Sequence, residues 1–363
     1  MNHSPGNPST SSESMVGDSL DTVRGVDYRE LTAWLGTLVS DLTPPVTARR
    51  LGVGQSNLTY ILSDAAGHRW VLRRPPLGHL LNSAHDVLRE ARILSALAST
   101  SVPVPRIYAV AQATEVGDAP LVLMEFVDGV VISDVSASRS LPARARHSAG
   151  IALAETLGRI HAVDLGTVNL ADLASHSPYA QRQLKRWSSQ WERSKTRELA
   201  ELDSLTDRLR ATVPPPRELT LVHGDLHLRN IVVSDFDGEI LAALDWELAT
   251  LGDPIADLGT TLAYWPENDE TVLPEFRALL LPGYPRRADL IERYCLITGR
   301  DVADAELAFW HALALWKVAI IAEGILRRAQ EDPRNRAESG VPVHQTVNDL
   351  VALAHDIAAR AGI

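Results

Sequence analysis

The sequence predicts an α+β fold of two lobes, a small antiparallel sheet with one main helix followed by a larger, mostly helical lobe. Short runs of apolar and β-branched residues bounded by turn residues dominate up to residue 127, and such runs indicate strands. Segments with helical spacing of apolar residues dominate after Asp128-Gly129. We therefore expect lobes at 24–127 and 128–363, after a disordered tail at 1–23 that is rich in Ser, Pro, Gly and Asn.

The first lobe is expected to hold a leading helix, a main helix and a small sheet. The leading helix, 28–42, has amphipathic spacing and stops before Pro44-Pro45. The main helix, 83–97, follows from the spacing of its apolar residues and ends before Pro103. Strands are predicted at 46–51, 58–63, 69–73, 107–110 and 121–126.

The second lobe combines long helices with a strand-rich interruption. Apolar strands are predicted at 219–222, 230–233 and 240–245, the last two joined by a hairpin turn at 235–238. A sheet lobe beside a helical lobe leaves a cleft, which is where small-molecule sites are usually found. Helices are predicted at 143–163, 178–194, 197–213, 290–299, 303–329 and 347–359.

Three polar side chains stand near the ends of the interrupting strands. Asp225 and Asn230 are five residues apart, and Asp245 ends the last strand. A hairpin can bring all three into one cleft, and their order matches what phosphoryl transfer from a nucleotide requires. One carboxylate accepts the proton of a substrate hydroxyl, while an Asn five residues later and a further Asp hold Mg²⁺. Two protein ligands suffice, because Mg²⁺ also binds water and the phosphate oxygens of the nucleotide.

A glycine-containing loop in the first lobe is a candidate phosphate contact. The loop contains Gly54, Ser56 and Asn57, and its glycines allow backbone N–H groups to approach phosphates closely. It lacks the third glycine of the G-x-G-x-x-G pattern, so a plain tight turn is the competing interpretation. No Gly-Lys-Ser or Gly-Lys-Thr occurs in the chain, which excludes a P-loop.

The end of the third strand offers a cationic phosphate contact. Arg73 stands where a kinase uses a Lys on the phosphates, with Glu90 of the main helix as its ion-pair partner. A solvated surface pair is the alternative interpretation. Arginine can grip phosphate with two parallel hydrogen bonds, although its reach differs from that of lysine. Strand alternation places Arg73 and Arg74 on opposite faces, and the sequence leaves open which of them faces the cleft.

Composition limits the classes of partner. The formal net charge of −11 argues against nucleic acid as a general partner. Residues 1–20 lack the apolar stretch of a signal peptide, so we expect a cytoplasmic protein. The single cysteine, Cys295, excludes an intrachain disulfide and is expected to be a buried helical residue. The apolar helix at 307–326 contains His311, Lys317 and Glu323, which favours a core helix over a membrane span.

The central motifs resemble a known superfamily. His223-Gly-Asp-Leu-His-Leu-Arg-Asn230 and Leu244-Asp-Trp-Glu247 resemble the catalytic and metal motifs of the aminoglycoside phosphotransferase and choline kinase superfamily, which shares the protein-kinase fold. The resemblance spans about residues 45–330 and is closest to the phosphotransferase domain associated with acyl-CoA dehydrogenases. The segments similar to that domain include Gly54-Gln-Ser-Asn-Leu-Thr-Tyr60, Val71-Leu-Arg-Arg-Pro-Pro76, Leu157-Gly-Arg-Ile-His-Ala-Val-Asp164 and Ala249-Thr-Leu-Gly-Asp-Pro-Ile-Ala-Asp-Leu258.

The resemblance implies roles for individual residues. It implies ATP as co-substrate, with Asp225 as the catalytic base and His223 bracing its loop. It also implies a functional association with an acyl-CoA dehydrogenase. Arg73 replaces the Lys of the superfamily, and the glycine loop is incomplete, so phosphate positioning departs from the family pattern. The remaining implied assignments are Asn230 and Asp245 on Mg²⁺, Gly54, Ser56, Asn57, Arg73 and Glu90 on or near the phosphates, and Glu125 and Val127 of the hinge on the adenine.

Two other functions fit parts of the pattern. A nucleotide-binding pseudokinase scaffold would need the fold but not the chemistry, and the joint presence of Asp225, Asn230 and Asp245 argues against it. A metal-dependent hydrolase could use His223, Asp225 and His227, since alternate residues of a strand share one face. That interpretation leaves Asn230 and Asp245 without a role.

The sequence specifies the acceptor of the phosphate less closely than it specifies the reaction. The subfamily resemblance implies a hydroxyacyl-CoA-like or other small metabolic hydroxyl compound, while the acidic net charge permits an aminoglycoside-like one. The predicted helix at 178–194 offers basic groups that could face an anionic acceptor, and a solvated charged face is the alternative. These basic groups are Arg182, Lys185, Arg186 and Arg193.

Overall fold

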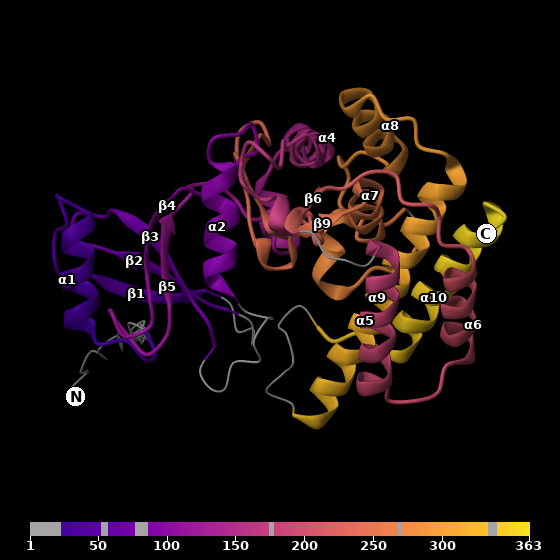
Figure 1. The fold of residues 1–363 in the computed structure, drawn as a ribbon, viewed down its shortest axis with the longest axis horizontal. Coiled ribbons are helices and arrows are strands. Elements are labelled where there is room, and N and C mark those ends of the chain that lie inside the picture. Colours follow the sequence, from indigo (N-terminus) through magenta and orange to yellow (C-terminus); the bar gives the residue numbers. More distant parts are fainter. Residues whose placement is uncertain (1–22, 52–56, 77–85, 174–177, 268–269, 333–339) are drawn as a thin grey trace, which may run out of the picture.

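The computed structural model describes residues 23–51, 57–76, 86–173, 178–267, 270–332 and 340–363. Residues 1–22 of the tail predicted at 1–23 lie outside these residues, as do the glycines and Ser56 of the predicted phosphate loop, while Val23 is described and is buried. The chain forms a sheet lobe and a helical lobe side by side (Figure 1). This agrees with the two-lobed α+β fold that the sequence predicts.

The sheet lobe is a five-stranded antiparallel sheet in the order β1-β2-β3-β5-β4. Helix α1 covers one face, and α2 lies between the other face and the helical lobe (Figure 1). Side chains alternate between these faces: Leu72 and Leu123 pack under α1, whereas Val122 and Met124 join the main core. The elements are α1(Tyr28–Leu38), β1(Thr47–Leu51), β2(Leu58–Ser63), β3(Arg69–Arg74), α2(Val87–Leu97), β4(Ile107–Ala111) and β5(Leu121–Glu125).

The leading helix is shorter than predicted. Asp27 caps its N-terminus by accepting from the N–H groups of Arg29 and Glu30, and the helix ends at Leu38 instead of residue 42. The backbone N–H of Thr43 donates to the Asp64 carboxylate over 3.0 Å. Because this bond ties the segment to the β2–β3 turn, the chain must leave the helix early to enter β1.

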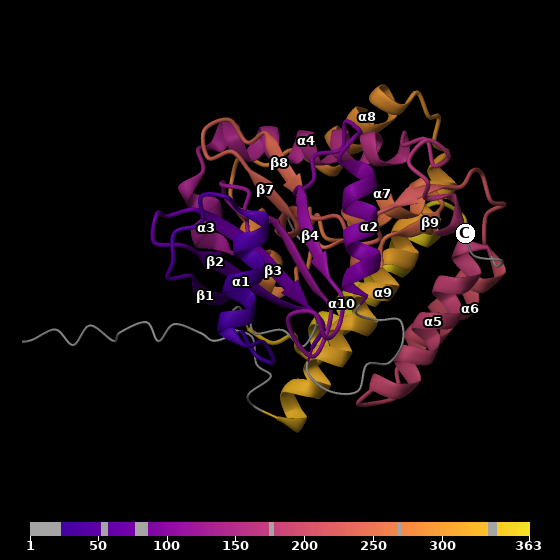
Figure 2. The ribbon, with the colours of Figure 1, turned by 60° about the vertical axis from the view of Figure 1, so that its left-hand side comes forward.

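The helical lobe is built around α9. Helix α9 packs against α7, α10, α5 and α6, with α10 running alongside it (Figures 1 and 2). The lobe also holds two small antiparallel sheets, β6-β9 and β7-β8. Its elements are α3(Val135–Ser140), α4(Ala143–His161), α5(Tyr179–Ser194), α6(Ala200–Ala211), β6(Thr220–Val222), β7(Ile231–Val233), β8(Ile240–Ala243), β9(Thr250–Gly252), α7(Pro254–Ala263), α8(Arg287–Thr298), α9(Asp304–Glu331) and α10(His344–Arg360).

Helix α7 and strand β9 are absent from the predicted elements. The local signal for the helix was present, because Asp253 caps the N-terminus by accepting from Ile255 N–H, and Pro254 occupies the first turn. The apolar residues on all sides of α7 obscure the helical spacing, since this helix is buried almost throughout. Strand β9 is only Thr250–Gly252 and forms through pairing with β6.

Helix α9 is long and apolar enough to cross a membrane by length and composition alone, yet its most apolar window is 83% buried within the chain. The side chains of Trp316, Ala319 and Ile320 are completely covered by neighbouring helices. This is the arrangement of a core helix.

Candidate active site

The loop after β6 is held on two sides, by the buried side chain of Asp257 and the partly buried side chain of Lys317. Both carboxylate oxygens of Asp257, on α7, accept backbone N–H groups, from His223 and Gly224, each over 2.7 Å. Lys317, on α9, donates its ammonium to the Gly224 carbonyl over 3.0 Å. Gly224 has φ +82°, a conformation that suits glycine. The backbone immediately before Asp225 is therefore held in place by these hydrogen bonds.

The Asp225 carboxylate has polar neighbours from its own loop and from the helices. His227 Nε2 lies 3.5 Å from its Oδ2, and the charge of Asp225 adds to the effect of burial in raising the pKa of Tyr264, at the end of α7. Burial by itself would raise the pKa of Asp225, but the charges of His227 and Lys317 outweigh it and hold the pKa below its usual range. Asp225 is therefore ionised at neutral pH and can accept a proton.

Asn230 and Asp245 lie beside one another at the base of the β7-β8 hairpin. The N–H of Leu244 donates to the Asn230 carbonyl over 2.8 Å, and the Asn230 side-chain NH₂ donates to the Asp225 carbonyl over 2.9 Å. This leaves the amide oxygen of Asn230 available as a ligand. Strand β8 ends at Ala243, two residues earlier than predicted, because Asp245 adopts a left-handed conformation with φ 64° and ψ 63°.

His223 joins the two halves of the site. Its Nε2 donates to the Leu244 carbonyl over 2.9 Å, and its ring lies 4.6 Å from the ring of Trp246. The imidazole thus connects the loop carrying Asp225 to the residue before Asp245. This is the bracing position that the family resemblance implies, and the side chain is fully buried.

Of the two adjacent arginines at the end of β3, Arg73 is the one that faces the helical lobe. Its guanidinium lies 2.7 Å from Glu90 and 3.2 Å from Asp245. Arg74 points to the opposite face, where it is buried and contacts Asp118 over 2.6 Å. Burial raises the pKa of Glu90 to about 6 although the charge of Arg73 opposes it. Arg73 and Glu90 are therefore a buried pair and not the solvated surface pair considered as the alternative.

Asn57 contacts Glu247, an acidic residue that was not among the predicted site residues. Its side-chain NH₂ donates to Glu247 over 3.4 Å, from the start of β2 to the helical lobe. Burial, together with the nearby charge of Asp245, raises the pKa of Glu247 to about 7. Gly54 and Ser56 lie outside the described residues. The end of the loop is therefore placed next to Glu247, two residues after Asp245, while its glycines lie outside the described residues.

The predicted adenine contacts lie where the sheet lobe leads into the helical lobe. Glu125 ends β5, and its N–H already donates to the Arg106 carbonyl over 2.8 Å. Its carboxylate accepts from Arg106 N–H over 3.1 Å. Val127 follows in the connecting segment, partly buried. Of these two residues, Val127 is the one whose N–H forms none of the backbone hydrogen bonds in the described part of the chain.

The alternative cluster of His223, Asp225 and His227 does not converge on one point. His223 Nε2 is bonded to Leu244, whereas His227 faces Asp225 and packs edge-on against Tyr264 and Phe276, with centroids 4.8 and 4.9 Å away. In the part of the chain that the structure describes, no group of three or more His, Cys, Asp or Glu side chains is placed to hold a metal ion. The geometry therefore disfavours the metal-dependent hydrolase.

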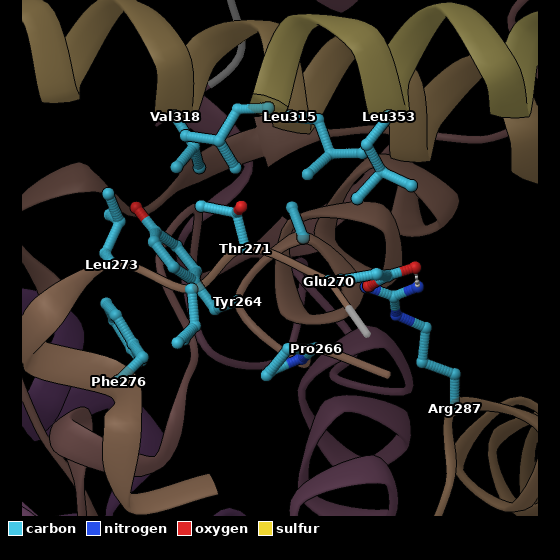
Figure 3. Close-up of a pocket in the computed structure, with 13 residues that line it drawn as sticks. Tyr264, Pro266, Glu270, Thr271, Leu273, Phe276, Arg287, Leu315, Val318 and Leu353 are labelled. Carbon is cyan, nitrogen blue, oxygen red and sulfur yellow. Dashed lines mark hydrogen bonds and ion pairs between the residues drawn. The ribbon is translucent and has the colours of Figure 1, made fainter. Parts of the chain in front are cut away.

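A small cavity behind Tyr264 is too confined for a substrate. Tyr264 stacks on Phe276 at 4.5 Å, and the cavity continues towards Leu315 and the Glu270–Arg287 ion pair (Figure 3). Its volume of about 10 Å³ admits at most one water molecule. The acceptor must therefore approach Asp225 from another side.

Asp257, Tyr264, Glu247 and Lys317 were not among the predicted site residues. Asp257 carried a usable signal, since it follows the helix-starting Asp253-Pro254 pair by one turn. Lys317 and Tyr264 gave no signal in the sequence, apart from being polar residues within apolar segments.

The two lobes, together with the loop that carries Asp225, define a phosphotransferase of the protein-kinase-like fold. Residues 47–290, well over half of the chain, match the phosphotransferase enzyme family, so the chain belongs to that family. It is 33% identical to mouse acyl-CoA dehydrogenase family member 10 and 31% identical to rat acyl-CoA dehydrogenase family member 11, over 90% and 92% of this chain. The matched regions cover only 30% and 43% of those relatives. The chain thus spans less than half of their length.

A solved structure shows the same fold throughout. A protein from Ralstonia eutropha JMP134, provisionally described as an aminoglycoside phosphotransferase, superposes with a TM-score of 0.72 at 29% identity and covers 93% of this chain and 98% of its own. The family that the sequence motifs predict is thereby confirmed.

Proposed function

We propose that this protein is an ATP-dependent phosphotransferase that moves the γ-phosphate to a hydroxyl group of a small molecule. One observation carries the proposal: Asp225, Asn230 and Asp245 meet at one edge of the helical lobe, and Arg73 reaches Asp245 from the sheet lobe. A base, oxygen ligands and a phosphate-binding cation are the parts that phosphoryl transfer needs.

The candidate metal ligands fit Mg²⁺. The amide oxygen of Asn230 and the carboxylate of Asp245 are hard oxygen donors, and the Asp245 side chain is 39% exposed. Bound Mg²⁺ would neutralise charge that develops on the phosphates in the transition state. With only two protein ligands, such a site is completed by the nucleotide and by water.

The remaining chemistry is supplied by residues of the chain. Asp225, held by its neighbours in the ionised form, would orient the acceptor hydroxyl and take its proton. Arg73 would contact phosphate oxygens while Glu90 holds its guanidinium in place. His223 keeps Asp225 and Asp245 in register through Leu244. Positioning and electrostatics would then provide most of the rate.

The acceptor classes under this proposal are hydroxyacyl-CoA-like metabolites and aminoglycoside-like compounds. The two mammalian relatives are named for acyl-CoA dehydrogenase activity, and this chain matches less than half of each. We therefore place the metabolic class first and propose a functional association with an acyl-CoA dehydrogenase. A cytoplasmic location is part of the same proposal.

The test is transfer itself. The protein is incubated with Mg-ATP, or Mg-GTP in parallel, and a panel of hydroxyl compounds, while ADP or GDP release and a mass gain of one phosphoryl group on the acceptor are followed. We expect transfer to at least one acceptor and loss of transfer with EDTA. Nucleotide binding without transfer to any acceptor or to water would favour the pseudokinase scaffold instead.

A further inference from the structure

Two consecutive residues of α2 hold opposite ends of the Asp245 turn, residues 245–249. Glu90 accepts from the Trp246 N–H, near the start of the turn, over 3.2 Å. Arg89 donates through its guanidinium Nη2 to the carbonyl of Ala249, at the end of the turn. Because both contacts come from one helix, α2 holds the turn as a unit and not at a single point.

The Arg89 side chain is directed at this carbonyl and not at a carboxylate. Its backbone N–H donates over 2.9 Å to Asp86, the residue that caps α2, so the start of the side chain is fixed. The side chain itself is half-buried. In the part of the chain that the structure describes, Ala249 is the residue to which its guanidinium donates. A charged donor of this kind forms a stronger hydrogen bond to a carbonyl than a neutral one.

The Asp245 turn needs such support because Asp245 has a left-handed backbone conformation, with φ 64°. This conformation is unfavourable for a residue other than glycine and persists only where the surroundings fix it. On the preceding side, His223 Nε2 donates to the Leu244 carbonyl over 2.9 Å. On the following side, the contacts from α2 provide the support.

The end of the turn that Arg89 holds also lies against the catalytic loop. A Cβ on Gly224 would lie 3.1 Å from the carbonyl oxygen of Leu248, the residue before Ala249. Thr250, the residue after Ala249, pairs with Val222 of β6, which leads into the loop. A shift of the Ala249 carbonyl would therefore be passed to the loop as well as to Asp245.

We propose that Arg89 is a positioning residue for the candidate metal ligand Asp245 and that it acts through the Ala249 carbonyl. The proposal rests on the proposed function, because Asp245 belongs to the Mg²⁺ site of that reaction. Arg73 contacts the Asp245 carboxylate itself, whereas Arg89 sets the backbone from which this carboxylate projects. Residues that orient a metal ligand without touching the metal change metal affinity or activity by about 10- to 100-fold when they are replaced.

The test measures how much Mg²⁺ strengthens nucleotide binding. Calorimetric titration with the non-transferable analogue AMP-PNP, in excess Mg²⁺ and in EDTA, gives two affinities, and their ratio is the metal gain. We expect Mg²⁺ to strengthen binding to the unmodified protein. Arg89→Gln and Arg89→Met should each reduce the metal gain about 10-fold and leave the affinity in EDTA nearly unchanged. Arg89→Lys, which can still donate to a carbonyl, should retain more of the gain.

Arg92 provides a matched control on the same helix. It is exposed and also joins α2 to the helical lobe, donating to Asp172 over 2.8 Å and to the Asn169 carbonyl over 2.7 Å. These partners lie outside the Asp245 turn, so Arg92→Gln should leave the metal gain unchanged. Equal reductions in Arg89→Gln and Arg92→Gln would mean that only the docking of α2 matters, which would contradict the assignment of Arg89.

The two affinities separate failure of this inference from failure of the proposed function. If folded Arg89 variants keep the full metal gain, or lose affinity equally in Mg²⁺ and in EDTA, Arg89 has a structural role at most. The inference then fails and the proposed function stands. If Mg²⁺ does not strengthen binding to the unmodified protein, the proposed function fails and the inference fails with it. Thermal unfolding verifies that each variant is folded.

Discussion

Arg73, at the end of β3, donates a hydrogen bond to the Asp245 carboxylate over 3.2 Å, so a residue of the sheet lobe contacts a candidate metal ligand of the helical lobe directly. The same guanidinium holds Glu90, and Glu90 in turn accepts from the Trp246 N–H over 3.2 Å. Sheet, helix α2 and the Asp245 turn are thereby joined through a single side chain.

Replacing Arg73 should therefore reduce stability as well as activity. Arg73→Met leaves the Glu90 carboxylate buried without its partner, and we expect the free energy of unfolding to fall by about 2–4 kcal/mol. Arg73→Lys keeps the charge but loses the forked geometry, so it should cost less. Urea denaturation measures both. Arg69→Met, which removes an exposed pair with Asp128, should change stability by less than about 1 kcal/mol. Equal stability of Arg73→Met and Arg69→Met would contradict this interpretation.

Replacing Asp225 should affect turnover far more than folding. Asp225→Asn removes the proton acceptor while keeping the shape of the side chain, and we expect kcat to fall about 10²- to 10⁴-fold with nucleotide affinity nearly unchanged. Steady-state kinetics and nucleotide titration provide the two measurements. Asp235→Asn, in the exposed β7-β8 turn, is the matched control and should behave like the unmodified protein. Undiminished turnover in Asp225→Asn would remove Asp225 from the mechanism.

Acidification should destabilise the fold through His311. Burial, with the charge of Arg287, lowers the pKa of this α9 residue to about 3. The unfolded chain then binds a proton below about pH 6.5 that the folded chain does not, so stability falls as pH decreases from about 6.5 towards 3. The slope from this one group approaches about 1.4 kcal/mol per pH unit. In urea titrations over this range, His311→Gln should show a shallower slope, and His147→Gln, at an exposed position, should not.

Close contact of α7 with α9 depends on Gly259. A Cβ at this position would lie 2.7 Å from the carbonyl carbon and oxygen of Trp310, and neither backbone can yield without moving its helix. We expect Gly259→Ala to lower the free energy of unfolding by about 1–3 kcal/mol. Gly36→Ala in α1 meets nothing within 4 Å and should be neutral or stabilising by up to about 1 kcal/mol. Thermal and urea unfolding of both variants test the contrast.

Local patterns in the sequence predict most helices and strands and the three central polar residues. Asp225, Asn230 and Asp245 could be located because short strands and one hairpin bring them together without help from distant segments. The supports of the loop could not be located in this way. Lys317 is 93 residues from Gly224 and Asp257 is 34 from His223, so their roles depend on how α7 and α9 pack.

The choice between Arg73 and Arg74 also depends on the packing of distant segments, which local sequence patterns do not show. Alternation along β3 assigns them to opposite faces, but only the position of the helical lobe decides which face is the cleft. Strand β8 ends earlier than predicted because Asp245 takes a left-handed backbone conformation. The alternation of apolar and polar residues gives no sign of such a conformation.

The two faces of β3 also limit where the chain can change length. Arg73 faces the helical lobe and contacts Asp245, whereas Arg74 is buried against Asp118 and the backbone of Arg24. Deleting one residue inside the strand would exchange these two arginines and turn every neighbouring side chain to the wrong face. Insertions and deletions between β2 and β3 should therefore be tolerated in the exposed turn at 65–68 and nowhere within the strand. Chimeric or shortened forms of the protein should keep residues 69–74 as an uninterrupted block.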